Sequence, residues 1–432
     1  MARPFWFTKF LVQSGIARFL PAARRLTDDG AACLRYYSDQ VLAAPVEEFL
    51  DAAYFPTAGP DVIDLNLPAP RFESSVSLGR VIADRHGNPP PRGLPELRTA
   101  IADFYRRRDG RAIDSECEVF VTHGATGAFA AVLDAFVNPG DGVVLFDPSS
   151  PLFSLGARSR RADIRWVPTQ NVDGRCHHAK NDLDRALRRA KLLVIANPAN
   201  PTGARFEAED LEEIMQSAAK RGVLVYLDES FGLKSRASGA ISEGRVLRAG
   251  SISQEWGLGS VRVGWIAGLR HLVQACGLTA NLHAPFVSTL CQQIAARAIE
   301  GADLSACEAD PFASRRQYVV DRLRTLGLAP EPTTSGYFAW VSVASLGMDG
   351  RTFSERLLKE QRVLVRPGCV FGPSGANHIR ISLAADDGRL REGLGRIVAF
   401  AGGSREAACE LSAPIPSVPE VASPIAPAFS RA

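Results

Sequence analysis

The sequence predicts an α/β protein in which a mostly parallel sheet forms a large domain and a smaller α/β domain follows it. Apolar runs rich in β-branched residues recur between about residues 95 and 300, and amphipathic helical patterns separate them. This alternation is typical of a parallel sheet covered by helices on both faces. The strand candidates are Val119–Thr122, Val143–Phe146, Leu192–Ile195 and Val223–Leu227. The clearest helix candidate, Glu207–Lys220, carries its apolar residues Leu211, Ile214 and Met215 on one face.

Four segments follow one another along the chain. We expect residues 1–75 to be an N-terminal arm and part of the small domain, 76–300 the large domain, 301–402 the C-terminal small domain, and 403–432 a disordered tail. The tail is rich in Ala, Pro and Ser, so it cannot bury enough apolar area to offset its ordering entropy. In the arm, apolar residues from Phe10 to Leu20 recur at roughly helical spacing. They predict packing on a partner subunit, with a membrane-surface helix as the alternative.

The composition is that of an ordinary globular protein and excludes several classes. The chain has 432 residues, 46% hydrophobic and 22% charged, with a net charge of +3. No basic run with interleaved aromatics predicts nucleic-acid binding, and no run of 18 apolar residues predicts a membrane span. Eight scattered cysteines without metal-ligand spacing favour a reduced, cytoplasmic protein without a metal site.

Two loops and one acid at the ends of predicted strands carry the chemistry, together with one arginine near the C-terminus. Gly124-Ala125-Thr126 opens a helix, where backbone N–H groups at the positive helix end suit a phosphate. Asn197–Gly203 contains two X-Pro bonds and a final glycine, which fix a rigid loop at a strand's C-terminal end. Asp228 ends another strand. Near the C-terminus, Arg380 lies between apolar residues and needs a partner that a carboxylic acid could supply.

In order along the chain, these motifs resemble the class I/II aminotransferases, pyridoxal-phosphate (PLP) enzymes of fold type I. Gly93–Arg98 matches the family's GxxELR helix start, Asn197–Gly203 its NPxNPTG loop, and Ser251–Arg262 its lysine segment. The resemblance covers about residues 90–400. It implies the aminotransferase fold, a homodimer whose active site lies between subunits, a cofactor that is PLP or pyridoxamine phosphate, and an amino or keto acid substrate.

Carried over residue by residue, the resemblance assigns a role to each matched position. Gly124, Ala125, Thr126, Ser251 and Arg262 would bind the phosphate, Asn200 the ring oxygen, Asp228 the pyridine nitrogen and Arg380 the substrate α-carboxylate. A carboxylate at Asp228 keeps the ring nitrogen protonated, which lets the ring accept carbanion charge.

One departure concerns the lysine that forms the Schiff base with the cofactor. The family places Ser three residues before this lysine and Arg eight residues after it; here Ser251 and Arg262 hold those offsets and Gln254 takes the lysine's place. A carboxamide cannot form an imine, and near neutral pH it cannot shuttle a proton. We therefore expect the cofactor to bind non-covalently.

Three further departures lie around the same predicted pocket. Phe231 replaces the tyrosine that contacts the ring hydroxyl, and Ser150 replaces an aromatic residue over the pyridine, for which Phe153 could compensate. Asn88 stands where the family has a tyrosine that reaches the other subunit's phosphate.

A general base would have to come from elsewhere, since no lysine occurs between residues 235 and 358. The candidates are His123 beside the phosphate turn, Glu255 next to Gln254, and Lys234 beyond Asp228.

These observations leave three hypotheses. The first is an aminotransferase-like enzyme that binds PLP or pyridoxamine phosphate non-covalently and handles an amino acid or keto acid. The second is a catalytically silent homologue with a binding or partner role, against which Asp228 argues, because a buried carboxylate without a partner is costly. The third is an enzyme of the same fold that no longer uses PLP, which the changes at Ser150 and Phe231 favour.

Overall fold

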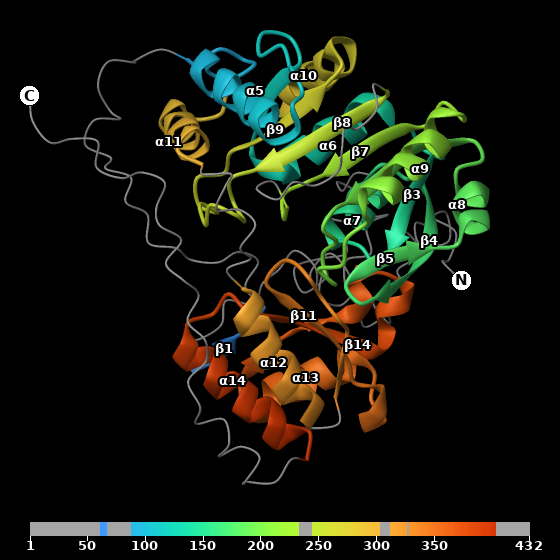
Figure 1. Cartoon of the computed structure of the whole chain (residues 1–432), viewed down its shortest axis with the longest axis vertical. Helices are drawn as coiled ribbons and strands as arrows, with labels where there is room; N and C mark the ends of the chain where they lie inside the picture. The colour runs from blue at the N-terminus through green and yellow to red at the C-terminus, as the bar shows by residue number, and fades with distance from the viewer. Residues whose placement is uncertain (1–60, 67–87, 233–243, 303–311, 326–327, 403–432) are drawn as a thin grey trace, which may run out of the picture.

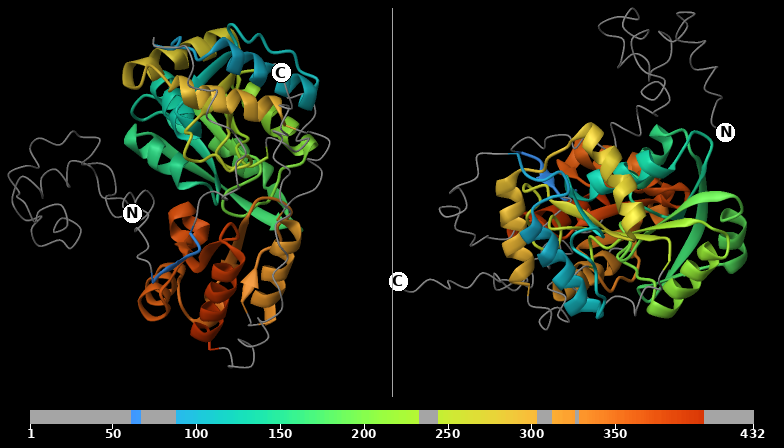
Figure 2. Two further views of the ribbon diagram at one scale, coloured as in Figure 1. Left: turned by 90° about the vertical axis from the view of Figure 1, so that its left-hand side faces the viewer. Right: turned by 90° about the horizontal axis from the view of Figure 1, so that it is seen from above.

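The computed structural model of the chain describes residues 61–66, 88–232, 244–302, 312–325 and 328–402. They form a larger α/β part around an eight-stranded sheet and a smaller α/β part below it in Figure 1. The views in Figure 2 show the same two parts. This arrangement confirms the predicted α/β class. The apolar segment predicted as a helical arm, the predicted tail 403–432 and Lys234 lie outside the described residues.

The large sheet is parallel at its centre and antiparallel near its ends. Its strands β4, β3, β6, β7 and β8 are parallel neighbours, β9 runs antiparallel between β8 and β2, and β5 forms a hairpin with β4. In spatial order they are β2 (Val119–Thr122), β9 (Gly264–Gly268), β8 (Val246–Ser251), β7 (Leu224–Asp228), β6 (Ala190–Ala196), β3 (Gly142–Asp147), β4 (Asp163–Val172) and β5 (Arg175–His178). The four predicted strands are confirmed, with ends that differ by at most two residues.

Helices cover both faces of this sheet because successive strand residues point to opposite sides. On one face Val143 and Leu145 pack with α6 (Gly124–Phe136), α7 (Pro151–Ser159) and α10 (Arg270–His283). On the other, Val144 and Phe146 pack with α8 (Lys180–Ala186) and α9 (Ala208–Ala219), and α5 (Pro95–Asp109) and α11 (Thr289–Glu300) cover β2 and β9. Helix α9 confirms the helix predicted over 207–220.

The smaller part has its own core between two small sheets and three helices. A four-stranded antiparallel sheet has the order β10 (Ala329–Pro330), β11 (Phe338–Ser342), β14 (His378–Ser382), β13 (Arg366–Pro367). Strand β1 (Ile63–Asp64) pairs in parallel with β12 (Val363–Leu364), which brings the first described residues into this part. Its helices are α12 (Ala313–Thr325), α13 (Gly350–Gln361) and α14 (Asp387–Phe400), with 3₁₀ turns η5 (Ala344–Leu346), η6 (Gly368–Phe371) and η7 (Pro373–Asn377).

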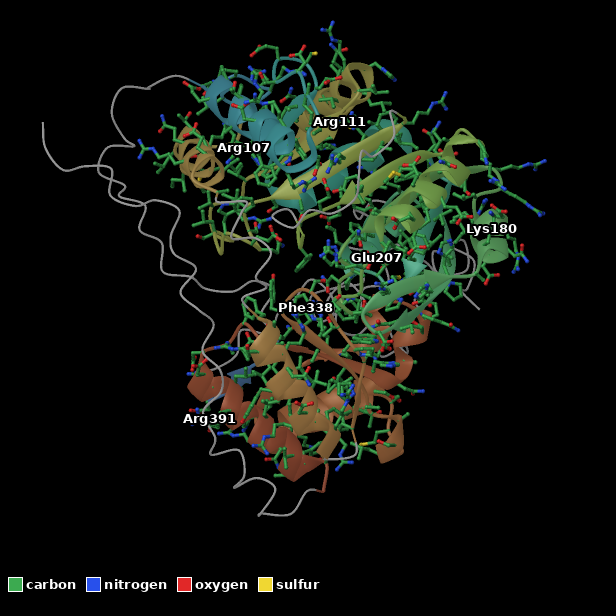
Figure 3. All side chains as sticks on the ribbon, viewed as in Figure 1. Arg107, Arg111, Lys180, Glu207, Phe338 and Arg391 are labelled. Atoms are coloured by element: carbon green, nitrogen blue, oxygen red, sulfur yellow. The ribbon has the colours of Figure 1, made fainter. Side chains whose placement is uncertain are left out.

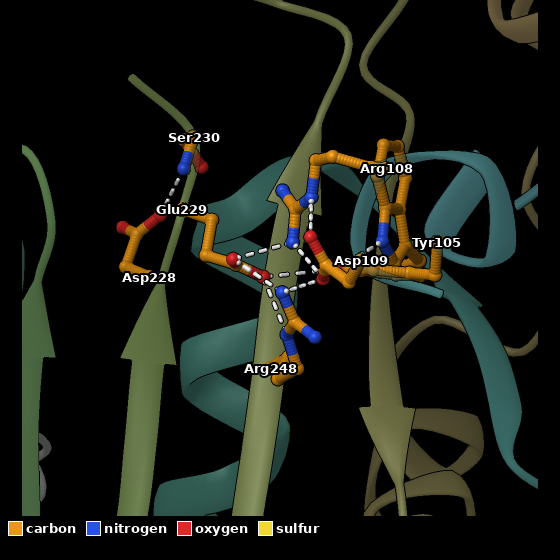
Figure 4. A network of polar contacts seen from close by, with 8 residues as sticks. Tyr105, Arg108, Asp109, Asp228, Glu229, Ser230 and Arg248 are labelled. Carbon is orange, nitrogen blue, oxygen red and sulfur yellow. Dashed lines mark hydrogen bonds and ion pairs between the residues drawn. The ribbon is translucent and has the colours of Figure 1, made fainter. Parts of the chain in front are cut away.

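Two arginines and two carboxylates form a buried network on the α5 side of the sheet (Figure 4). Arg248 of β8 donates to both Glu229 oxygens over 2.8 and 2.6 Å, and Arg108 of α5 donates to Glu229 over 2.8 Å. Both arginines also bond Asp109, each over 2.7 Å. The four side chains are at most 5% exposed. Because each charge has opposite neighbours, the network is neutral and joins α5 to two central strands.

The network predicts a large loss of stability when one of its charges is removed. Glu229→Gln leaves two buried arginines with Asp109 as their remaining carboxylate in the network, so we expect the free energy of unfolding to fall by about 3–5 kcal/mol. Urea unfolding followed by circular dichroism measures this change.

The matched control is Glu116→Gln, which breaks an ion pair to Arg98 in which the Glu116 side chain is 72% exposed. Arg98 is buried but also donates to the Gly93 and Ser115 oxygens, so we expect loss of the exposed Glu116 charge to cost roughly 0–1 kcal/mol. Equal losses in the two variants would show that the buried network does not stabilise the fold.

Candidate active site

The carboxyl end of β7 carries the buried acid Asp228. Asp228 is 7% exposed, and its Oδ1 accepts a hydrogen bond from the Ser230 backbone N–H over 2.9 Å. Within the described residues, no arginine, lysine or histidine forms an ion pair with it. Burial raises the pKa of this carboxyl group, and the Ser230 bonds oppose that shift. Burying a carboxylate without a partner is costly, so this position suits a cationic group.

The turn Gly124–Thr126 forms the first turn of α6, as the sequence predicts, and Arg262 lies against it. Gly124 has a φ of +70°, and a Cβ there would lie 2.6 Å from the Arg262 Nη2. Gly264 of β9 approaches from another side, since its Cβ would lie 2.5 Å from the Gly124 carbonyl carbon. Backbone N–H groups at a helix start beside a guanidinium make a cradle for an anion.

Ser253, which the sequence analysis did not single out, links two predicted phosphate ligands. Ser251 donates through its Oγ to the Ser253 Oγ over 2.8 Å and accepts the Ser253 backbone N–H over 3.0 Å. Arg262 in turn reaches the Ser253 Oγ over 3.5 Å. In the sequence, the Ser-x-Ser spacing of Ser251 and Ser253 could have indicated that both serines lie at the phosphate turn.

The loop Asn197–Gly203 and strand β14 meet at Arg380. The Asn200 Oδ1 accepts a hydrogen bond from the Arg380 Nη1 over 3.0 Å, across 180 residues of sequence. The guanidinium is buried and lies 4.0 Å from the ring centroid of Phe338, which faces the larger part in Figure 3. Burial, aided by Arg366, lowers the pKa of Arg380 to about 9. The structure thus joins two of the predicted ligand contacts.

Gln254 and the described base candidates, His123 and Glu255, lie outside the helices and strands. Gln254 is half-buried in the loop after β8, and its Oε1 is buried without a hydrogen-bond partner among the described residues. His123 immediately precedes α6, and burial and the nearby Arg262 lower its pKa, which favours the neutral imidazole. Glu255 acts electrostatically on Tyr337 of the smaller part.

The other departures from the family pattern lie as follows. Phe231 packs against Tyr337 and Phe338, with ring centroids 5.7 Å apart in each pair. Ser150 is half-buried immediately before α7. The interpretation that Phe153 compensates for Ser150 is wrong, because Phe153 is fully buried in the core, where it contacts Phe129 and Tyr226.

Asn88, the remaining departure, is exposed.

Among the described residues, no group of three or more His, Cys, Asp or Glu side chains is placed to hold a metal ion. Within the same residues, no helix is both long enough and apolar enough to cross a membrane.

The chain belongs to the class I and II aminotransferase family, whose profile matches residues 80–397. Membership of this family implies a PLP-dependent, transferase-like enzyme.

Several characterised aminotransferases are similar along most of the chain. The LL-diaminopimelate aminotransferase of Desulforudis audaxviator is 31% identical over 78% of this chain and 90% of that relative. The glutamate-pyruvate aminotransferase AlaC of Escherichia coli K12 is 28% identical over 79% of this chain and 87% of its own length. The crystal structure of an aspartate aminotransferase from Thermotoga maritima superposes with a TM-score of 0.75 at 25% identity, over 85% of this chain and 100% of that one.

The close approach of Gly264 to the phosphate turn gives a stability prediction. Gly264→Ala forces the Gly124 backbone away from β9, so we expect a loss of about 1–3 kcal/mol in the free energy of unfolding. Differential scanning calorimetry and urea titration measure it.

Gly388→Ala is the matched control, because its Cβ would meet its nearest neighbour, Asp386, at an ordinary 3.5 Å in α14. We expect this control to be neutral or to gain up to about 1 kcal/mol. A neutral Gly264→Ala variant would contradict the tight packing of the turn.

Proposed function

We propose that this chain is an aminotransferase-like enzyme that binds PLP or pyridoxamine phosphate non-covalently and acts on an amino acid or keto acid. The observation that carries the proposal is the buried Asp228 carboxylate without an opposite charge among the described residues. A protonated pyridine nitrogen is the partner that such a carboxylate fits. Without that partner, burying the Asp228 carboxylate would destabilise the fold, with no interaction to offset the loss of hydration.

The remaining groups fit the other ends of the cofactor and substrate. The first turn of α6 and Arg262 suit the phosphate, with Ser251 and Ser253 beside them. Asn200 would offer its amide nitrogen to the ring oxygen, because Arg380 engages its Oδ1. Arg380 suits the carboxylate of an amino acid or keto acid. When bound, the cofactor supplies an electron-accepting ring on which an amino group is exchanged.

We propose that Gln254 stands at the lysine position and holds the ligand by hydrogen bonds alone. Its buried Oε1 is an acceptor that a bound amino group could satisfy. Gln254 has no titratable proton, so another group must move the proton during the reaction. His123 supports this role best among the described candidates, because its neutral ring can accept a proton. Glu255 stays an alternative.

A same-fold enzyme that does not use PLP is the second candidate. The observation that favours it is Phe231, which carries no hydroxyl and packs on Tyr337 and Phe338 instead. A silent homologue with a partner role is the third candidate; the buried Asp228, which forms no ion pair among the described residues, argues against it.

We also propose that the chain forms a homodimer, as aminotransferases usually do. Large apolar side chains are exposed on α10, in the connection after it and at the start of α11: Leu278 is 73% and Leu282 80% exposed, and Phe286 and Leu290 are more than one-third exposed. Exposed apolar side chains of this size in consecutive segments support a covered interface.

A cytoplasmic location is the corresponding proposal for the cell. Cys117, Cys176, Cys276, Cys291 and Cys369 are free thiols, which suits a reducing compartment.

Titration with each vitamer tests the proposed function directly. We expect saturable binding of pyridoxamine phosphate and PLP by calorimetry, and full release of PLP on gel filtration because no covalent link forms. Asp228→Asn should weaken binding about 10- to 100-fold, since it removes a hydrogen-bonded charge pair. Acidification below the raised pKa of Asp228 protonates the carboxylate and should weaken binding in the parent chain, with no such step in Asp228→Asn.

Glu116→Gln is the control for general effects of charge removal, since that side chain is exposed. If neither vitamer binds the parent chain, the proposed cofactor is wrong and the second or third candidate takes its place. Binding that Asp228→Asn does not change would remove the assignment of Asp228.

The proposed dimer predicts different outcomes for two exposed apolar residues. Leu282→Glu places a charge in the α10 face, so we expect the dimer dissociation constant to rise about tenfold or more. Val172→Glu, at a site 50% exposed on β4, is the matched control and should leave dimerisation unchanged. Sedimentation velocity over a concentration series measures both. A monomeric parent chain, or equal effects of the two changes, would contradict this interface.

A further inference from the structure

Arg380 is held by neutral acceptors and keeps one donor unused. Its Nη1 donates to the Asn200 Oδ1 over 3.0 Å, and its Nη2 lies 3.3 Å from the Asn66 backbone oxygen and 3.4 Å from the Asn66 Oδ1. Its Nε is buried and has no hydrogen-bond partner among the described residues. A guanidinium has five N–H donors and no acceptor, so this arrangement leaves the Nε–H available to donate to a ligand.

A second buried arginine lies beside Arg380 in the sheet. Arg366 of β13 is the Cα partner of Arg380 in β14, so the two side chains share one face of the sheet, and both are 5% exposed. Burial and Arg366 lower the pKa of Arg380, while Tyr337 and Asp64 oppose this shift. The neighbouring Arg366 therefore adds to the positive potential at Arg380, which favours an incoming anion.

Asn66 is buried beside this charge and also has an unused donor. It is 1% exposed, and its Nδ2 has no hydrogen-bond partner among the described residues. Its position is fixed by the backbone on both sides: the Leu65 oxygen accepts the Ser382 N–H of β14 over 2.7 Å, and the Asn66 N–H donates to the Asp64 Oδ1 over 2.8 Å. A buried amide N–H without an acceptor is unfavourable, and a ligand that accepts its hydrogen bond removes this cost.

We propose that Asn66 is a second specificity-determining residue of the carboxylate site. Its side-chain oxygen holds the Arg380 Nη2, and its Nδ2 donates to the incoming carboxylate together with the Arg380 Nε. Because an amide is neutral, it positions the guanidinium without cancelling its charge. The naming of the ligand as an amino or keto acid rests on the proposed function, whereas the pairing of Asn66 with a carboxylate does not.

Asn66→Asp tests the proposal because it changes charge with little change of shape. The new carboxylate would lie beside the Arg380 Nη2 and act as an internal substitute for the ligand. In chloride buffer we expect the midpoint of thermal unfolding to rise, since the added charge faces two arginines and one aspartate. Pyruvate at matched ionic strength should stabilise the parent chain saturably, and its affinity should fall at least tenfold in Asn66→Asp.

Asn66→Ala keeps the proposal testable if the aspartate variant fails to fold. It removes the donor without adding a charge, so pyruvate affinity should fall about tenfold, because one hydrogen bond to a charged group is lost. Ser342→Ala, on β11 of the same sheet, is a control that should leave the affinity unchanged.

Pyridoxamine phosphate binding, measured by calorimetry in the same variants, separates the two proposals. It should stay within about threefold of the parent value in Asn66→Ala, since ring nitrogen and phosphate contacts are elsewhere. If the parent chain binds pyruvate but neither vitamer, the proposed cofactor fails and the role of Asn66 stands. Unchanged pyruvate affinity in both Asn66 variants, or no pyruvate binding by the parent chain, would overturn the role of Asn66.

Discussion

The buried network of Arg108, Asp109, Glu229 and Arg248 is the constraint on which the candidate site depends. Glu229 directly follows Asp228, and its N–H also donates to the Ala249 oxygen of β8 over 2.9 Å. Consecutive residues at a strand end point to opposite sides, so a Glu229 fixed among two arginines directs Asp228 the other way. A carboxylate held in this manner can meet a ligand without first losing conformational entropy, which favours binding.

The site also depends on how the smaller part is attached to the carboxyl edge of the large sheet. Ser335 donates through its Oγ to the Gly203 oxygen over 2.6 Å, and Ser374 donates to the Asp147 Oδ1 over 2.8 Å. Asn171 also donates to Glu331 and Pro332, and Phe231 packs on Tyr337 and Phe338, so polar and aromatic contacts together join the two parts. Arg380 donates to Asn200 across the same boundary. The position of the guanidinium proposed to bind the substrate carboxylate therefore depends on how the two parts are placed relative to each other.

The sequence predicted the strands and the ligand loops well because both are local properties. Val119–Thr122 is a β-branched and aromatic run, and the prolines and glycine of Asn197–Gly203 restrict that loop by themselves. The network around Glu229 and the contact of Asn66 with Arg380 could not be predicted in this way. Their partners are 19 to 314 residues apart, and nothing in the local pattern of Asn66 distinguishes it from a surface asparagine. Only the tertiary fold, in which the Leu65 oxygen accepts the Ser382 N–H of β14, makes it a neighbour of Arg380.

Asp228 and Arg380 are buried charges of opposite sign that do not neutralise each other. Each is held by neutral groups: Asp228 by the Ser230 N–H, and Arg380 by two asparagines. Burying a charge this way is unfavourable in the free protein, and a ligand that brings a cation to one and a carboxylate to the other recovers that free energy. Charged residues in place of Asn66 or Asn200 would stabilise the empty site and compete with the ligand. We therefore propose that the neutral amides keep the site able to bind a charged ligand, and that such a ligand would pair two charges that form no ion pair within the described residues.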